Sequence, residues 1–284
     1  MHDVRPPAVA SMFYPDDRIN LTRMINGFLS EVPDENREFF QKNRVDHLFG
    51  LISPHAGYVY SGPVAAHAYD LLRGRSVDTV ILIGPSHFTH FAGFSLPFFK
   101  AFETPLGEVE LDEPFIHKLL EDGGGVFDTI HSAHIKEHSL EVQLPFLQEV
   151  LEDFPFKIVP VLMGEQTWQS VHKGAEVLSE ILKIDDKHFL IVVSTDLSHY
   201  HTDAEAREMD AKTIQFFENL DAQALMRGMH TGEIEACGMG PVAVLLETAR
   251  ILGYTNFRTL DYRTSGDSSG DLSRVVGYVS AALW

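Results

Sequence analysis

Three histidines each follow a short apolar segment that has the composition of a buried strand. His55 comes after HLFGLIS, His87 after DTVILIG and His199 after HFLIVVS. Imidazole nitrogens are the commonest metal ligands in proteins, and imidazole also serves as a general acid or base near neutral pH. Because ligands of parallel α/β sheets bind beyond the carboxyl ends of the strands, we expect these histidines to meet in one site.

The spacing of His55 and His87 excludes a local metal motif. The two residues are 32 positions apart, so they can meet only through the sheet. Gly57 beside His55, and the pair Gly84-Pro85 before His87, permit tight turns at both places. Two imidazoles on rigid strand ends would form a preorganised edge of a metal site.

Cys237 is the single cysteine of the chain, so the chain forms no internal disulfide, in keeping with a reducing cytoplasm. It stands in ACGMGPVAVLLETA, just before a helix expected to start near Pro241. Helix amino-terminal amides favour the thiolate, which is the metal-binding form. A His/His/Cys set suits copper, iron or zinc better than magnesium or calcium. The alternative is an inert core cysteine.

Asp196 and His199 lie three positions apart in STDLSH. In a turn or short helix they would share one face, where the carboxylate could orient the imidazole. His199 could then act as a general acid or base, or stabilise an anionic substrate. A hydrolytic set built on Ser194 or Ser198 is disfavoured, because the chain has no G-x-S-x-G elbow at either serine.

The segment EHSLEVQLPFL is expected to open a helix at the edge of the site. Its three core leucines, at helical spacing, are Leu140, Leu144 and Leu147. We expect His138 to face the pocket, and Glu137, Glu141 and Gln143 to act as scaffold.

Alternating strand and helix patterns must position these residues. Unbroken apolar runs predict strands covered on both faces, at His47–Ser53, Asp78–Gly84, Phe156–Gly164 and His188–Ser194. Helical spacing predicts helices at Pro63–Arg73, Ser139–Glu152, Trp168–Lys183, Ala204–Leu220 and Val242–Leu252. The segments NFRTLDYRTS and SRVVGYVSAALW predict two late, antiparallel strands, whereas Glu121–Asp128 and Thr264–Asp271 are expected to be loops. The pattern predicts an α/β fold, a three-layer α/β/α sandwich with a mostly parallel central sheet.

Composition narrows the possible partners. The 284 residues include 22 basic and 41 acidic side chains, a net charge of −19. Such a surface repels phosphate backbones and anionic lipid, so nucleic acid and membranes are not expected partners. No apolar run approaches the ~18 residues of a membrane span, and the start lacks a signal-peptide core. We therefore expect a cytoplasmic protein. No linker or repeat divides the chain, so residues 1–284 are expected to form a single domain.

Taken together, these motifs resemble the MEMO family, known in prokaryotes as AmmeMemoRadiSam system protein B. The resemblance covers nearly the whole chain, through the segments SMFYPDD, SPHAGYVYSGPVAAHAY, ILIGPSHF, TPLGEVELD, EHSLEVQLPFL, VPVLMG, VVSTDLSHY and CGMGPVAVLL. It implies the fold of class III extradiol ring-cleaving dioxygenases, which hold non-haem iron with two histidines and a carboxylate.

The resemblance also implies roles for individual residues. His55 and His87 match the two histidine ligands, and Cys237 falls where the dioxygenases have a glutamate. His199 matches their catalytic histidine, with Asp196 as its neighbour. Because thiolate is softer than carboxylate and is itself oxidisable, ring cleavage does not follow from the shared fold.

We therefore expect a metal-dependent redox enzyme that binds iron or copper through His55, His87 and Cys237. His199 would serve as acid or base, supported by Asp196 and His138. The alternatives are a peptide-binding adaptor, since family members are described in signalling and peptide recognition, and a hydrolase that uses zinc-bound water. The expected ligand is a small molecule or a peptide, and a homo-oligomer is compatible with the resemblance.

Overall fold

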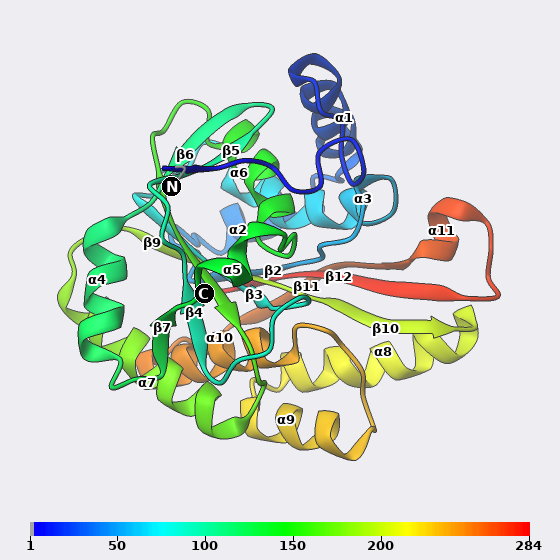
Figure 1. The fold of residues 1–284 in the computed structure, drawn as a ribbon. Helices are drawn as coiled ribbons and strands as arrows, with labels where there is room; N and C mark the ends of the chain where they lie inside the picture. Colours follow the sequence, from blue (N-terminus) through cyan, green and yellow to red (C-terminus); the bar gives the residue numbers. More distant parts are fainter. Residues whose placement is uncertain (1–2) are drawn as a thin grey trace.

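A mixed β-sheet with helices on both faces forms the centre of the computed structural model, which describes residues 3–284 (Figure 1). Its strands follow the order β10-β12-β2-β9-β3-β8-β4-β7, and β11 pairs with β12. The bounds are β2 Gly50–Ser53, β3 Thr79–Pro85, β4 Phe94–Leu96, β7 Phe127–Thr129, β8 Lys157–Met163, β9 Phe189–Ser194, β10 Asp196–His201, β11 Phe257–Thr264 and β12 Val275–Leu283. A small separate sheet contains β1 Val4–Arg5, β5 Ala101–Thr104 and β6 Gly107–Glu110.

The centre of the large sheet is parallel. Strands β2, β9, β3 and β8 are neighbours in that order, and each overlaps one of the four segments expected to be strands from the apolar runs. On either side, β12 runs antiparallel to β2, and β4 runs antiparallel to β8. The α/β fold is confirmed. The parallel pairs of this sheet are those between its central strands and the β4–β7 pair.

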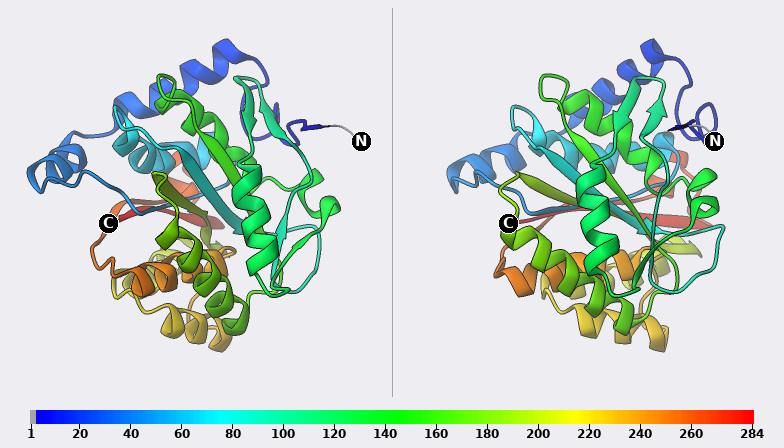
Figure 2. Two further views of the ribbon diagram at one scale, coloured as in Figure 1. Left: turned by 90° about the vertical axis from the view of Figure 1, so that its left-hand side faces the viewer. Right: turned by 60° about the vertical axis from the view of Figure 1, so that its left-hand side comes forward.

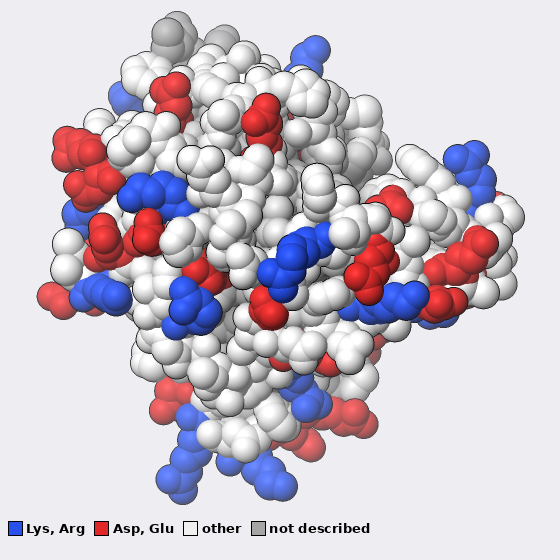
Figure 3. All heavy atoms as spheres, turned by 90° about the horizontal axis from the view of Figure 1, so that it is seen from below, with Lys and Arg blue, Asp and Glu red and all other residues white. Residues whose placement is uncertain are grey.

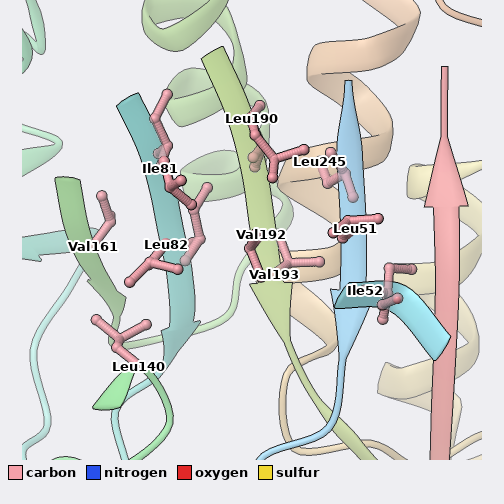
Figure 4. Close-up of a cluster of buried hydrophobic side chains, with 14 of the residues drawn as sticks. Leu51, Ile52, Ile81, Leu82, Leu140, Val161, Leu190, Val192, Val193 and Leu245 are labelled. Carbon is pink, nitrogen blue, oxygen red and sulfur yellow. The ribbon is translucent and has the colours of Figure 1, made fainter. Parts of the chain in front are cut away.

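The central strands are apolar throughout because helices cover both of their faces. Leu51, Ile81 and Val192 come from three neighbouring strands and are at most 1% exposed. Figure 4 shows these side chains beside Leu245, which projects from a helix onto the sheet. Burial on both sides removes the alternation of polar and apolar residues that a one-sided sheet would show.

The helices form two groups, one on each face of the sheet (Figures 1 and 2). The upper group in Figure 1 contains α1 Arg18–Glu31, α2 Glu35–Lys42, α3 Tyr58–Tyr69 and α6 Leu144–Val150. The short helix α5 His131–Ile135 lies at the level of the sheet and contacts β4. The lower group contains α7 Trp168–Ile184, α8 Asp203–Glu218, α9 Ala222–Thr231 and α10 Met239–Leu252. Of these, α3 contacts β2 and β12, whereas α10 contacts β3 and β9. The remaining helix bounds are α4 Glu113–Asp122, α11 Ser265–Ser269, η1 Asp70–Leu72 and η2 Glu141–Gln143.

Several segments differ from the sequence prediction. The expected loop Glu121–Asp128 includes the end of α4 and the start of β7. The helix expected over Ser139–Glu152 is divided into η2 and α6, and Pro145 lies in the first turn of α6, where a missing N–H costs nothing. The expected loop Thr264–Asp271 contains α11, whose first turn is closed by a capping box between Thr264 and Asp267. The residues after β9, expected to form a turn or short helix, form the bulged strand β10.

No helix of the described residues is long and apolar enough to cross a membrane. Basic and acidic side chains intermingle on the face seen from below in Figure 1 (Figure 3), so this face shows no large area of one sign. Residues 1 and 2 of the expected single domain lie outside the described residues, and the domain assignment stays a prediction.

Candidate metal site

Three side chains from different parts of the sequence converge beyond the carboxyl edge of the sheet. His55 lies two residues after β2, His87 two residues after β3, and Cys237 two residues before α10. Their candidate ligand atoms all lie within 4.8 Å of one another. Cys237 Sγ lies 3.1 Å from His55 Nε2. The structure therefore brings together the three residues that the sequence analysis grouped, whereas metal binding itself stays a prediction.

His55 is fixed from two sides. Its amide N–H donates to Asp196 Oδ1 at 2.8 Å, and its ring Nδ1 lies 2.9 Å from Ser194 Oγ. The other nitrogen, Nε2, is left to face Cys237. Burial, followed by the nearby charge of His87, lowers the pKa of His55 well below its usual value. The ring is therefore neutral, the form that binds a metal.

His87 is held by a buried carboxylate, Glu137. One oxygen of Glu137 accepts the His87 amide N–H at 2.6 Å, and the other lies 2.9 Å from His87 Nδ1. The amides of His138 and Ser139 donate to this second oxygen as well. Burial raises the pKa of Glu137, but the hydrogen bonds and charge of His87 outweigh it and bring the pKa to about 2. A carboxylate in this position commonly orients a metal-binding imidazole.

Glu137 is a functional candidate that the sequence analysis assigned to scaffold. It lies 50 residues from His87 in the chain, so only the fold reveals the contact. The sequence feature that could have indicated a role for Glu137 in the site is its position directly before His138 in the segment EHS. Glu141 and Gln143, expected to act as scaffold, are both hydrogen-bonded in the interior. Glu141 accepts from Arg5 and Tyr14, and Gln143 donates to the Pro54 carbonyl.

His138 lies against the site, as expected. Its ring stacks on His87 with centroids 4.7 Å apart, and the ring of Phe13 meets it edge-on at 4.9 Å. His87, Glu137 and His138 form a second group with ligand-like spacing. Because Glu137 already accepts four N–H donors, this group supports the His87 ring and is less suited to hold a separate ion.

Asp196 lies in the site, but its role differs from the expected one. Its carboxylate accepts the His55 amide, and within residues 3–284 no hydrogen bond joins that carboxylate to the His199 ring. The predicted turn or helix would have placed both side chains on one face, whereas the observed strand β10 is bulged between them. Burial, partly offset by the His55 amide and by His199, raises the pKa of Asp196 to about 6.

His199 lies at the border of the site. Its charge influences the pKa of both His55 and Asp196, and its side chain is partly exposed. The His199 amide donates to Glu235 Oε1 at 3.2 Å, and Glu235 Oε2 lies 2.9 Å from His201 Nε2. Glu235, two residues before Cys237, therefore connects β10 to the cysteine loop.

The Cys237 loop is held mainly through its backbone. The Cys237 amide donates to the Asp196 carbonyl at 3.1 Å, and the Asp196 amide donates to Cys237 Sγ at 3.2 Å. Gln166, three residues after β8, holds the loop through two hydrogen bonds. Its Nε2 donates to the Cys237 carbonyl at 2.7 Å, and its Oε1 accepts the Gly240 amide at 2.6 Å. The sequence offered no signal for Gln166.

The thiol of Cys237 does not have the lowered pKa that its place before a helix suggested. Burial raises the pKa, and the neighbouring Asp196 carboxylate raises it further. Without a bound cation the thiol is neutral. The donor set of two imidazoles and one buried sulfur fits iron, copper or zinc, because magnesium and calcium prefer oxygen ligands.

Comparison with known proteins gives a consistent assignment over the whole chain. The family model described as "Memo-like protein" matches residues 5–282. The MEMO1 family protein of Methanobrevibacter smithii is 38% identical over 286 residues, which cover 98% of each chain. Its counterpart in Methanocaldococcus jannaschii is 37% identical over 291 residues and the full length of both chains.

A solved structure shares the fold at low sequence identity. It is the crystal structure of uncharacterized protein JW3007 from Escherichia coli K12, with a TM-score of 0.57 and 10% identity. The likeness covers 84% of this chain and 100% of that one. At this identity it concerns the fold alone.

Proposed function

Because the chain belongs to the Memo family and gathers two imidazoles and a thiol in one cluster, we propose that it is a metal-dependent redox enzyme. His55, His87 and Cys237 would hold iron or copper, with zinc as the alternative. The observation that carries the proposal is the 3.1 Å approach of Cys237 Sγ to His55 Nε2, with His87 within 4.8 Å. The enzyme would act on a small molecule or a peptide.

A bound iron or copper ion would supply one-electron redox chemistry. The protein's own groups supply orientation and protons. Glu137 and Ser194 hold the two imidazoles by their Nδ1 atoms, which leaves each Nε2 for the ion. His199, partly exposed at the border, is placed to give a proton to a substrate or take one from it. Asp196 and His138 keep the surrounding loops and rings in place.

The proposal includes a three-layer α/β/α arrangement related to that of class III extradiol dioxygenases, with Cys237 at the position of their carboxylate. The two groups of helices and the site at the carboxyl edge of the sheet support it. We also propose a cytoplasmic protein, able to form a homo-oligomer, with no nucleic-acid or membrane partner. The net charge of −19 supports the last of these points.

Metal analysis of tag-free protein after anaerobic reconstitution tests the proposal. We expect one equivalent of iron or copper in the wild type, and its loss in His55→Ala, His87→Ala and Cys237→Ser. His230→Ala, at an exposed histidine on α9, is the control and should keep the metal. Preferential uptake of zinc would favour hydrolysis, and a folded wild type that takes up no metal would overturn the proposal.

One observation favours an adaptor as the second candidate. Phe88 beside His87 and Tyr200 beside His199 are 59% and 65% exposed, so the site has an aromatic border open to solvent. Exposed aromatic side chains are common anchors in recognition surfaces. A peptide that binds equally well to the wild type and to the metal-free Cys237→Ser variant, without being altered, would support this reading.

A further inference from the structure

Basic residues gather in a hollow at the opposite, amino edge of the sheet. It has a volume of about 730 Å³ and is formed by segments that enter β2, β3 and β9. The basic and imidazole side chains that line it are Arg44, His47, Arg73, Arg75 and His188. Asp46 is the one acidic residue in the lining that the structure describes for residues 3–284. In a chain of net charge −19, this local excess of positive charge requires a specific explanation.

The sheet itself pairs the two histidines. Strands β2 and β9 are parallel neighbours, with Gly50 opposite Ile191. Three residues earlier, the same register brings His47 beside His188, and the two rings face each other with His47 Nδ1 2.6 Å from His188 Nε2. The pair is therefore held by two central strands.

This contact determines where the protons lie. At 2.6 Å, one of the two facing nitrogens must carry a proton and the other must accept it. A His47 ring that carries protons on both nitrogens donates from Nδ1 to His188 Nε2. Its Nε2–H is then left to donate to a further acceptor.

Two of the three arginines have no carboxylate partner among the described residues. Arg75 Nε donates to the Leu71 carbonyl at 2.8 Å, and its Nη1 donates to the Asp46 carbonyl at 2.7 Å. Half-burial lowers the pKa of Arg75. Arg44 follows the end of α2, with a φ of 53°, and forms no ion pair within residues 3–284. Arg73 differs, because it pairs with Asp70 at 3.1 Å.

We propose that this hollow binds a small anion of the phosphate class, held by Arg44, Arg75 and protonated His47. A planar guanidinium donates pairs of hydrogen bonds to such oxygens. The carbonyl contacts of Arg75 account for its Nε and Nη1 but leave Nη2 available. The volume lies in the range of small-ligand sites. The strongly negative net charge disfavours a nucleic acid as the occupant.

Binding should be linked to protonation of His47. The groups that face the pair are Arg75 from the loop before β3, Arg44 and Asp46 from the loop before β2, and Asp78, whose carboxylate accepts the His188 amide. Asp186 and Lys187, from the loop before β9, lie nearby. An anion adds negative charge beside His47 Nε2 and so favours its protonated form. We therefore expect tighter binding in mildly acid solution than in mildly alkaline solution.

Calorimetric titration of the full chain with inorganic phosphate and with sulfate tests the proposal. Sulfate does not titrate near neutral pH, so a change in its affinity between about pH 6 and about pH 8 reports on the protein. We expect Arg44→Ala to weaken sulfate binding roughly tenfold, the loss of about one charge-assisted hydrogen bond. Arg227→Ala, at an exposed arginine on α9, should bind as the wild type does.

The variant His47→Gln tests the contribution of His47 protonation to anion binding while it keeps a hydrogen-bond donor for His188. The Gln amide can still donate to His188 but does not take up a proton, so sulfate binding should persist with a much smaller pH dependence. Equal affinities in the wild type and Arg44→Ala, or no anion binding to folded wild type, would overturn the site. A pH dependence unchanged in His47→Gln would overturn the role of His47.

Tighter binding of glycerol 3-phosphate than of inorganic phosphate would identify a phosphate ester as the ligand, and the reverse order would identify the free ion.

Discussion

At the scale of single residues, the candidate metal site depends on groups that are not themselves ligands. Glu137 accepts four N–H donors and fixes both the ring and the backbone of His87. Asp196 binds the His55 amide through its carboxylate and the Cys237 loop through its backbone. The candidate ligand atoms can approach one another because these supporting contacts hold three separate loops in fixed positions relative to one another.

Glu137→Gln should weaken metal binding while the protein stays folded. Gln keeps one acceptor but loses the negative charge that favours a metal-binding His87 ring. We expect a loss in affinity of about 10- to 100-fold, typical for removal of a carboxylate that orients a ligand. Competition with a chromophoric chelator measures it. Glu180→Gln, on the exposed surface of α7, is the control, and an unchanged affinity in Glu137→Gln would show that Glu137 is only structural.

Metal binding should release a proton from Cys237. Burial raises the pKa of the thiol, so the metal-free site holds SH near neutral pH, whereas a metal ligand is thiolate. The affinity should therefore rise with pH, by about tenfold per unit for one proton released. Titrations in buffers of different ionisation enthalpy count the protons. They should be made above about pH 7, where Asp196 is already ionised. Binding without proton release would exclude Cys237 as a thiolate ligand.

At the scale of secondary-structure elements, the candidate metal site lies at the carboxyl edge of the central strands, and the hollow proposed to bind an anion lies at the amino edge. The central strands could be predicted because their unbroken apolar runs mark burial on both faces. Strand β10 could not be predicted, because DLSHYH has no such run. Within residues 3–284, β10 pairs with β12 alone. His55 and His87 could be grouped from their places after strands. Glu137, Ser194 and Gln166 act through contacts that no sequence spacing reveals.

A pH-dependent contribution should come from Asp112, the N-cap of α4. It accepts from the Phe115 amide, the Thr79 hydroxyl and Lys187 Nζ. Burial raises its pKa, but the contacts with Lys187 and Thr79 outweigh burial, so the folded pKa is lower than the usual value of 3.8. The stabilisation is therefore present above about pH 4 and is lost as the pH falls through the folded pKa.

Asp112→Asn isolates this charge effect, because Asn is an equally good N-cap. Near neutral pH we expect a loss of about 1–2 kcal/mol in the free energy of unfolding, reduced because Lys187 is partly exposed. The difference from the wild type should shrink in urea titrations at about pH 3. Asp153→Asn, at an exposed aspartate, should show no comparable change. A difference that is constant with pH would point to packing instead of charge.

At the scale of the whole molecule, the amino-terminal segment is part of the site's support. Arg5 forms a buried ion pair with Glu141 at 2.7 Å and donates to the Glu137 carbonyl. Glu141 also accepts the amides of Ala8 and Val9. This network fixes the segment that brings Phe13 against the His138 ring, so the first described strand and the candidate metal site share one set of buried polar contacts.

Tyr14→Phe should reveal how much this network contributes. The Tyr14 hydroxyl donates to the fully buried Glu141 carboxylate at 2.6 Å, and its removal leaves that charge with one partner fewer. We expect a loss of about 1.5–3 kcal/mol in the free energy of unfolding, measured by urea denaturation. Tyr60→Phe, at a tyrosine that is 42% exposed, should cost far less. Equal effects of the two substitutions would contradict a special role for the Glu141 network.

The hydrogen bonds that hold the Cys237 backbone have an evolutionary consequence. Gln166 binds the Cys237 carbonyl, and Asp196 binds the Cys237 amide, so neither contact depends on which side chain stands at position 237. A mutation there can exchange the ligand type while the loop keeps its course. Replacing sulfur with a carboxylate would give two imidazoles and one carboxylate, the set that suits oxygen-activating iron. If the proposed metal site is correct, the codon for residue 237 would decide between two kinds of metal chemistry on the same backbone.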